Sequence, residues 1–397
     1  MPASTPTPPP TSIYFENLNA IRFIAAFLVI VHHTEQLRSL LHVPNHWGNP
    51  VVLVIGKLGV VLFFVLSGFL ISYLLFKEED VTQTIDVRAF YMRRALRIWP
   101  LYFLIVFAAL FVLPRLPAFT LADFPREMVE KHLMAKLVLF VLFLPNLVLN
   151  VFGVIPYASQ TWSIGAEEQF YLVWPVLNKW VKNKLWLMIG VIAGYLTVKV
   201  GLSHVLPPGR VLFVLSGLVE STPIDCMAIG GLFAVVLHKP AGVASAIKQF
   251  LFRPAVQWVT LLAVTLLVGR GVTFEFLHYE IYAVLFGILI CNFAANPNRI
   301  FSLETPWLNY LGEISYGLYM FHTLAIVASI RLLQQTHLLN EWLLYPLVLT
   351  VAVTLAGLSY RFLERPFIRI KKKYAKIISG KDAKNVDMPA LALQKAN

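Results

Sequence analysis

The feature that most constrains this chain is an apolar run, residues 19–33, that carries an arginine and a histidine. Arg22 and His33 are eleven residues apart, about three helical turns, so both project from nearly the same face of a helix. They lie about 16 Å apart along its axis, roughly half the thickness of a hydrocarbon core. A charge at such a depth is expected to face protein or water. The alternative is that Arg22 reaches the lipid headgroups and His33 is hydrogen-bonded inside a bundle.

The composition is that of a membrane protein. Hydrophobic residues make up 58% of the 397 residues and charged residues only 14%, whereas about a quarter of a soluble protein is charged. Long apolar runs predict an all-α polytopic fold. The net charge of +12 is expected to reflect cytoplasmic loops and contact with anionic lipid, with no nucleic-acid partner.

The apolar segments predict about ten transmembrane helices. They are expected near residues 18–36, 52–76, 99–113, a helix ending near 179, 185–203, 224–238, 255–269, 279–295, 308–330 and 343–363. Residues 134–152 are interrupted by Pro145, Asn146 and Asn150 and are interpreted as a re-entrant or interfacial piece that walls a site. Residues 1–15 are expected to form a disordered leader, 16–368 the membrane domain and 369–397 a basic tail.

Basic residues predict the orientation. Most Lys and Arg fall into one set of loops, which includes residues 77–97 and the tail, and this bias marks the cytoplasmic side. Both termini are therefore expected to be cytoplasmic, in the plasma membrane. Arg93, Arg94 and Arg97 cluster just before the third span. Guanidinium groups bind phosphate, but a topology anchor would show the same pattern.

Other polar residues within or beside apolar runs are candidates for chemistry. Glu167 and Glu168 lie at the start of a helix, where they either orient or deprotonate a hydroxyl or belong to a capping box. An intramembrane histidine, His322, suits proton transfer. Asp225 is either functional or an N-cap residue. Cys226 and Cys291 lie in separate apolar runs, and the sequence shows no metal-ligand spacing.

Several motifs in order resemble those of the acyltransferase-3 family of integral-membrane acyltransferases. The matching elements are the pair Arg22 and His33, residues 64–70 in the second helix, Arg94 with Arg97, residues 161–171, and residues 315–322, which end in His322. The resemblance covers about residues 16–368. Asn17-Leu-Asn19 departs from the Asp-Gly pair that many members carry before the arginine, and no arginine precedes Asp225. An extracytoplasmic SGNH domain, which some members carry, is not expected here.

The resemblance implies transfer of an acyl group, with acetyl the expected one, from cytoplasmic acyl-CoA to a hydroxyl of a cell-surface or lipid-linked glycan in a bacterium. Acyl-CoA is then the donor substrate, and no metal is expected. The implied roles are these: catalytic His33, Glu167, Glu168 and His322; donor-binding Arg22, Arg93, Arg94 and Arg97; acceptor-side Trp162, Tyr171 and Asp225. His33 is expected to act as a general base or as a transient acyl carrier.

Two other classes of protein remain open at this point. A secondary transporter or flippase also has buried charges and a broken helix, and it would move its substrate without consuming acyl-CoA. A non-catalytic scaffold would leave Arg22 and His33 unexplained. The expected partners of an acyltransferase are the glycan acceptor, membrane lipid and, as one alternative for the final transfer, a separate extracytoplasmic transferase. The sequence leaves the acceptor and the oligomeric state open.

Overall fold

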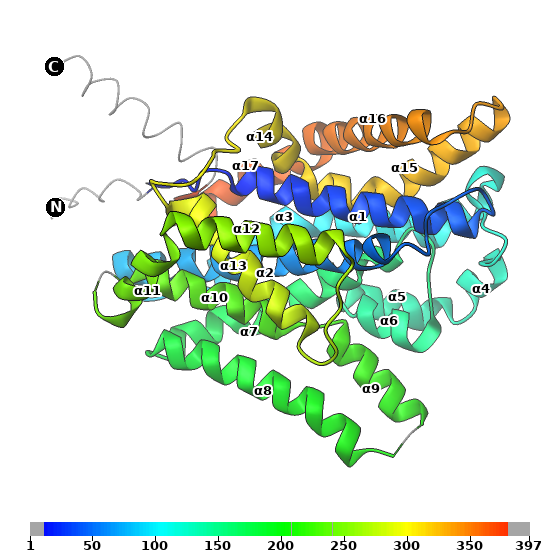
Figure 1. The fold of residues 1–397 in the computed structure, drawn as a ribbon. Coiled ribbons are helices and arrows are strands. Elements are labelled where there is room, and N and C mark those ends of the chain that lie inside the picture. The colour runs from blue at the N-terminus through cyan, green and yellow to red at the C-terminus, as the bar shows by residue number, and fades with distance from the viewer. Residues whose placement is uncertain (1–11, 208, 240, 380–397) are drawn as a thin grey trace, which may run out of the picture.

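The computed structural model describes residues 12–207, 209–239 and 241–379, and these form an all-α polytopic membrane protein (Figure 1). The α-helices are α1 (Leu18–Leu40), α2 (Pro50–Thr82), α3 (Val87–Phe107), α4 (Arg126–Glu130), α5 (Leu133–Val141), α6 (Pro145–Phe152), α7 (Trp162–Trp180), α8 (Lys184–Val205), α9 (Arg210–Glu220), α10 (Ile224–His238), α11 (Val243–Leu251), α12 (Pro254–Gly269), α13 (His278–Ala295), α14 (Pro306–Glu313), α15 (Ser315–Gln335), α16 (Glu341–Ser359) and α17 (Arg365–Lys371). Two short strands, β1 (Ser12–Ile13) and β2 (Ile378–Ser379), and six short 3-10 or π-helical segments complete the described elements.

Within the described residues, eight helical segments are long and apolar enough to cross a membrane, and a bent pair raises the number to nine. The eight are Leu18–Leu40, Pro50–Thr82, Val87–Arg115, Lys184–Leu202, Arg210–His238, His278–Ala295, Ser315–Gln335 and Glu341–Tyr374, and the bent pair is α11 with α12. One more span was expected from the sequence, the helix ending near residue 179, and it corresponds to α7. This helix carries the charged residues Glu167, Glu168 and Lys179 and is not among the segments apolar enough to cross. It nevertheless packs against α2 and α3 in the bundle.

The expected loop at residues 77–97 is mostly helical, which corrects the sequence-based boundary. Helix α2 continues to Thr82, and α3 begins at Val87. The carboxylate of Asp86 accepts a hydrogen bond of 2.9 Å from the Ala89 amide, so it caps the start of α3. As a result the three arginines before the expected third span lie on the helix itself, with their spacing fixed by its turns.

The two ends of the described chain meet. Strand β1 pairs in parallel with β2, with Ser12 opposite Ile378 and Ile13 opposite Ser379. Residues 1–11 of the expected leader and 380–397 of the expected tail lie outside the described residues.

The centre of the bundle is built on close contacts between α1, α2 and α10. Glycines permit these contacts. A Cβ at Gly68 would lie 1.9 Å from the Met227 carbonyl oxygen, and one at Gly230 would lie 2.1 Å from that of Val65. Small residues let helix backbones approach where lipid offers little hydrophobic drive for association. Helix α2 also packs against α1, which carries Arg22 and His33.

The segment expected to be re-entrant does not form one spanning helix. Helices α5 and α6 are separated by residues 142–144 and pack together. A Cβ at Gly165 of α7 would lie 2.5 Å from the Pro145 ring, and the Tyr102 hydroxyl of α3 donates to the Phe140 carbonyl at 2.9 Å. The segment therefore supports α3 and α7 from one side.

Candidate active site

Two histidines from distant parts of the chain face each other inside the bundle. The rings of His33 on α1 and His322 on α15 have centroids 4.8 Å apart. His33 is half-buried and His322 is fully buried. We call these two residues the histidine pair. The sequence proposed both as catalytic residues, and the fold brings them into contact.

The hydrogen bonds of the histidine pair fix which ring nitrogen carries the proton. Nδ1 of His33 lies 3.0 Å from the Val29 carbonyl oxygen, and Nδ1 of His322 lies 2.5 Å from that of Tyr319. A carbonyl oxygen only accepts, so each neutral ring donates from Nδ1 and keeps a lone pair on Nε2. Among the described residues, Nε2 of His322 is buried without a hydrogen-bond partner. Such a nitrogen is free to accept a proton.

A third ring, which the sequence reasoning did not single out, packs on His33. His32 lies 4.9 Å from His33 and 5.0 Å from Trp47, between ring centroids. Its Nδ1 donates to the Val52 carbonyl at 2.7 Å. In the sequence, only its position next to His33 could have indicated a role for His32. The loop that bears Trp47 is thereby connected to the histidine pair.

Polar contacts hold the histidine-bearing turn of α15 against the start of α7. The Tyr319 hydroxyl lies 2.7 Å from that of Ser163 and 2.9 Å from the Gln160 carbonyl oxygen. The Gln160 amide donates to the Met320 carbonyl at 3.2 Å. All of these side chains are buried. These contacts set the position of His322. The sequence showed the two motifs that contain these residues but not the contacts between them.

Arg22 points into the bundle and is oriented by its own helix. Its Nη1 donates to Oδ1 of Asn19 at 2.9 Å. It interacts electrostatically with Glu167, Arg94 and Arg97, and within the described chain it forms no ion pair. Asn19 stands at a departure from the family pattern, and the structure gives it this orienting role.

Glu167 and Glu168 face different neighbours. Glu167 accepts a 3.0 Å hydrogen bond from the Tyr171 hydroxyl, which in turn is hydrogen-bonded to Ser67 of α2. Glu168 accepts a 3.0 Å hydrogen bond from the Trp99 indole of α3, and its second oxygen is buried without a partner among the described residues. Trp99 and Ser67 were not singled out from the sequence.

Arg93, Arg94 and Arg97, which we call the arginine cluster, have unequal surroundings. Arg93 forms a 2.9 Å ion pair with the buried Glu78 and donates to the Tyr374 carbonyl at 2.8 Å. The guanidinium carbon of Arg94 lies 5.7 Å from the ring centroid of Phe90 and 5.8 Å from that of Tyr171. Its Nε is buried with no partner in the described part of the chain. Arg93 is therefore committed to the fold, whereas Arg94 retains an unused donor.

Two of the expected acceptor-side residues lie near this region, and one lies elsewhere. Tyr171 joins Glu167 as described, and Trp162 packs edge-on against Phe64, at 6.2 Å between centroids. Asp225 is fully buried, and its charged neighbours are Glu280 on α13 and Lys199 on α8. Lys199 forms a 2.8 Å ion pair with Glu280. The structure thus groups Asp225 with a second polar cluster and not with the histidine pair.

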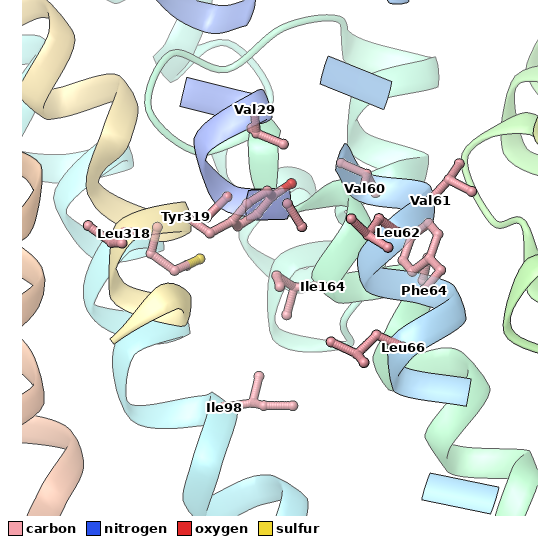
Figure 2. Close-up of a cluster of buried hydrophobic side chains, with 14 of the residues drawn as sticks. Val29, Val60, Val61, Leu62, Phe64, Leu66, Ile98, Ile164, Leu318 and Tyr319 are labelled. Atoms are coloured by element: carbon pink, nitrogen blue, oxygen red, sulfur yellow. The ribbon is translucent and has the colours of Figure 1, made fainter. Parts of the chain in front are cut away.

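Apolar side chains from five helices line the interior between these groups (Figure 2). They are Val29 from α1, Leu62 and Leu66 from α2, Ile98 from α3, Ile164 from α7, and Leu318 and Tyr319 from α15. Polar chemistry placed among such neighbours is shielded from water, which strengthens electrostatic interactions. No group of three or more His, Cys, Asp or Glu side chains in the described residues could hold a metal ion.

The chain matches the acyltransferase-3 family model, described as "Acyltransferase domain", over residues 15–361. This protein belongs to that family. The match extends from just before α1 to the end of α16, so it includes the histidine pair and the arginine cluster. The resemblance seen in the ordered motifs is confirmed.

Curated relatives from two bacteria illustrate the family. Peptidoglycan O-acetyltransferase OatA of Listeria monocytogenes is 26% identical over 387 residues, covering 89% of this chain and 56% of the relative. O-acetyltransferase OatA of Staphylococcus aureus is 26% identical over 384 residues, covering 91% of this chain and 58% of the relative. The chain thus spans a little more than half the length of these relatives. No solved structure matches the chain.

Proposed function

We propose that this protein transfers an acyl group, expected to be acetyl, from cytoplasmic acyl-CoA to a hydroxyl of a cell-wall glycan. Membership of an acyltransferase family supports group transfer. The relatives named as peptidoglycan O-acetyltransferases support a glycan acceptor. The single observation that carries the proposal is the histidine pair, because it places an Nε2 lone pair inside a family-matched bundle.

In this proposal His33 is the general base. Its Nε2 removes the proton from the acceptor hydroxyl while the hydroxyl oxygen attacks the thioester carbonyl carbon. The C–S bond then breaks, and the imidazolium returns the proton to the leaving thiolate, so that an ester and free CoA are formed. The Val29 carbonyl accepts from Nδ1 and so stabilises the imidazolium in between, as an orienting acceptor does in other base-catalysed transfers.

His322 and the glutamates are assigned supporting roles. The His322 ring lies against His33 and presents a bare Nε2, so it is placed to orient either the acceptor hydroxyl or the catalytic ring. Glu167, fixed by Tyr171, is within electrostatic range of both Arg22 and Arg94. We assign Arg22 to guiding the thioester end of the donor, and Arg94 and Arg97 to binding phosphates. Both termini and the arginine cluster are then cytoplasmic.

The decisive test replaces His33. We expect His33→Ala to lower acyl transfer by about a hundredfold or more, because a positioned general base contributes that much. The measurement is mass spectrometry of cell-wall glycans from cells that carry the variant, the unaltered protein or neither. His204→Ala is the matched control, because His204 is an exposed histidine on α8 and its loss should leave acetylation unchanged.

Two outcomes would contradict the proposal. Normal acetylation by a well-expressed, monodisperse His33→Ala protein would remove His33 from the base role. Movement of a glycan across proteoliposomes without consumption of acetyl-CoA would favour a transporter. A covalent acyl adduct on His33, detected by peptide mapping after reaction with acetyl-CoA, would identify it as the acyl carrier.

A further inference from the structure

The helical segment after α16 packs against α3, the helix that carries the arginine cluster. Helix α17 packs along α3, and the Arg93 guanidinium donates to the Tyr374 carbonyl just beyond it at 2.8 Å. A few residues later, β2 pairs with β1 at the start of the chain. Residue 371 is thus held in place from both sides. From the sequence, this stretch was expected only as part of a basic tail.

Lys371 of α17 lies close to the arginines. It interacts electrostatically with Arg22, Arg93, Arg94 and Arg97, and it is half-buried, whereas Lys373, two residues later, is exposed. Only Arg93 of these arginines has a carboxylate within ion-pair distance in the described residues. Glu167 and Glu364 lie within electrostatic range of the group but do not pair with it.

Such a gathering of cations, in which Arg93 alone has a carboxylate within ion-pair distance among the described residues, is unfavourable unless an anion occupies it. Like charges a few Å apart repel one another, more strongly where water is excluded. The buried, unpartnered Nε of Arg94 is an unused charged donor in the same place, and a buried donor without a partner costs about 1–3 kcal/mol. A ligand carrying several phosphate charges would relieve both penalties. Arginine supplies bidentate contacts, and lysine adds a compact point charge.

We propose that Lys371 is a donor-binding residue that contacts the phosphates of acyl-CoA together with Arg94 and Arg97. The inference rests on the proposed function and extends it by making α17 a wall of the donor site. Arg93 acts differently, because its bonds to Glu78 and to the Tyr374 carbonyl hold α17 against α3. The donor site is therefore formed by α1, α3 and the segment after α16.

The test measures the KM for acetyl-CoA and the binding of CoA to the purified full-length protein in nanodiscs. We expect Lys371→Gln to raise both KM and Kd about tenfold, with kcat at saturating donor changed less than twofold, because a charge-assisted contact to phosphate is lost. Lys371→Arg should restore most of the affinity. Lys373→Gln removes the same charge two residues away on an exposed side chain and should behave like the unaltered protein.

The outcomes separate this inference from the proposed function. If Arg94→Gln and Arg97→Gln weaken CoA binding but Lys371→Gln does not, the role of Lys371 is wrong and the acyltransferase assignment stands. If Lys373→Gln is as impaired as Lys371→Gln, the effect is a general one of surface charge, and the specific contact is also wrong. If the unaltered protein neither binds CoA nor transfers acetyl, the proposed function itself fails.

Discussion

Arg93 and Arg94 are adjacent in sequence and have different surroundings in this structure. Arg93 is paired with the buried Glu78, which also accepts a 2.9 Å hydrogen bond from the Asp86 amide. Arg94 has no such partner among the described residues and keeps a buried donor unused. Neighbouring helix positions point about 100° apart. One arginine therefore stabilises the fold while the next remains available to a ligand.

The ion pair between Arg93 and Glu78 predicts a loss of stability when one partner is removed. We expect Glu78→Gln to lower the free energy of unfolding by about 2–4 kcal/mol, because it leaves Arg93 buried and uncompensated. Arg93→Gln combined with Glu78→Gln should recover part of that loss, since no lone charge remains. The measurement is a double-mutant cycle of thermal unfolding in detergent. Strictly additive losses would show that the ion pair contributes nothing.

At the scale of elements, the bundle depends on helices that touch through their backbones. Gly68 of α2 lies against the Met227 carbonyl of α10, and Gly230 of α10 lies against the Val65 carbonyl of α2. The contact is reciprocal, so neither helix can shift without disturbing the other. Helix α1 packs on the same helix α2. The position of the histidine pair therefore depends on the fit between α2 and α10.

We expect Gly68→Ala to destabilise the protein by about 1–3 kcal/mol, as overpacking of an interior does. Its Cβ would lie 1.9 Å from a backbone oxygen that has no flexible end to move aside. Gly190→Ala is the control, because nothing lies within 4 Å of a Cβ at that position of α8. The control should be neutral or stabilising, since alanine is the better helix former. Thermal unfolding in detergent compares the two, and equal melting temperatures would contradict the packing argument.

At the scale of the whole molecule, one buried asparagine connects the first helix to distant segments. Asn17 has a left-handed backbone at φ 62° and is fully buried. Its side chain donates to the Phe293 carbonyl at 2.8 Å and accepts from the Leu303 amide at 2.5 Å and the Ser302 hydroxyl at 3.1 Å. Helix α1 is thus anchored just before Arg22. Asparagine suits the site because it tolerates the left-handed region and offers both a donor and an acceptor.

We expect Asn17→Ala to lower the free energy of unfolding by about 2–4 kcal/mol, because buried hydrogen-bonding groups lose their partner and alanine is strained at positive φ. Asn17→Gly separates the two causes, because glycine also removes the side-chain hydrogen bonds but adopts positive φ without strain. Thermal unfolding of both variants is the measurement. If Asn17→Ala melts like the unaltered protein, the asparagine is not an anchor. Asn298→Ala, in the connection after α13, serves as a control because the Asn298 side chain is exposed.

The residue types alone determined that this is an all-α membrane protein, because so apolar a chain must satisfy its backbone hydrogen bonds within helices. The ordered motifs also determined the family, now confirmed. The inward direction of Arg22 was predictable because a charge is costly in lipid. The hydrogen-bonding and charge arguments could be made from sequence because each concerns a single helix and its surrounding solvent.

Contacts between remote segments were decided only by the tertiary structure. Three contacts depend on how helices pack: the contact of the His33 ring with that of His322, the ion pair of Arg93 with Glu78 and the closeness of Lys371 to the arginines. Their sequence separations carry no information about distance in space. Asp225 illustrates the converse, because the family resemblance implied an acceptor-side role, and packing placed it beside Glu280. Periodicity fixes the face that a residue occupies on its own helix, whereas the partner of that face is set by the fit of whole helices against one another.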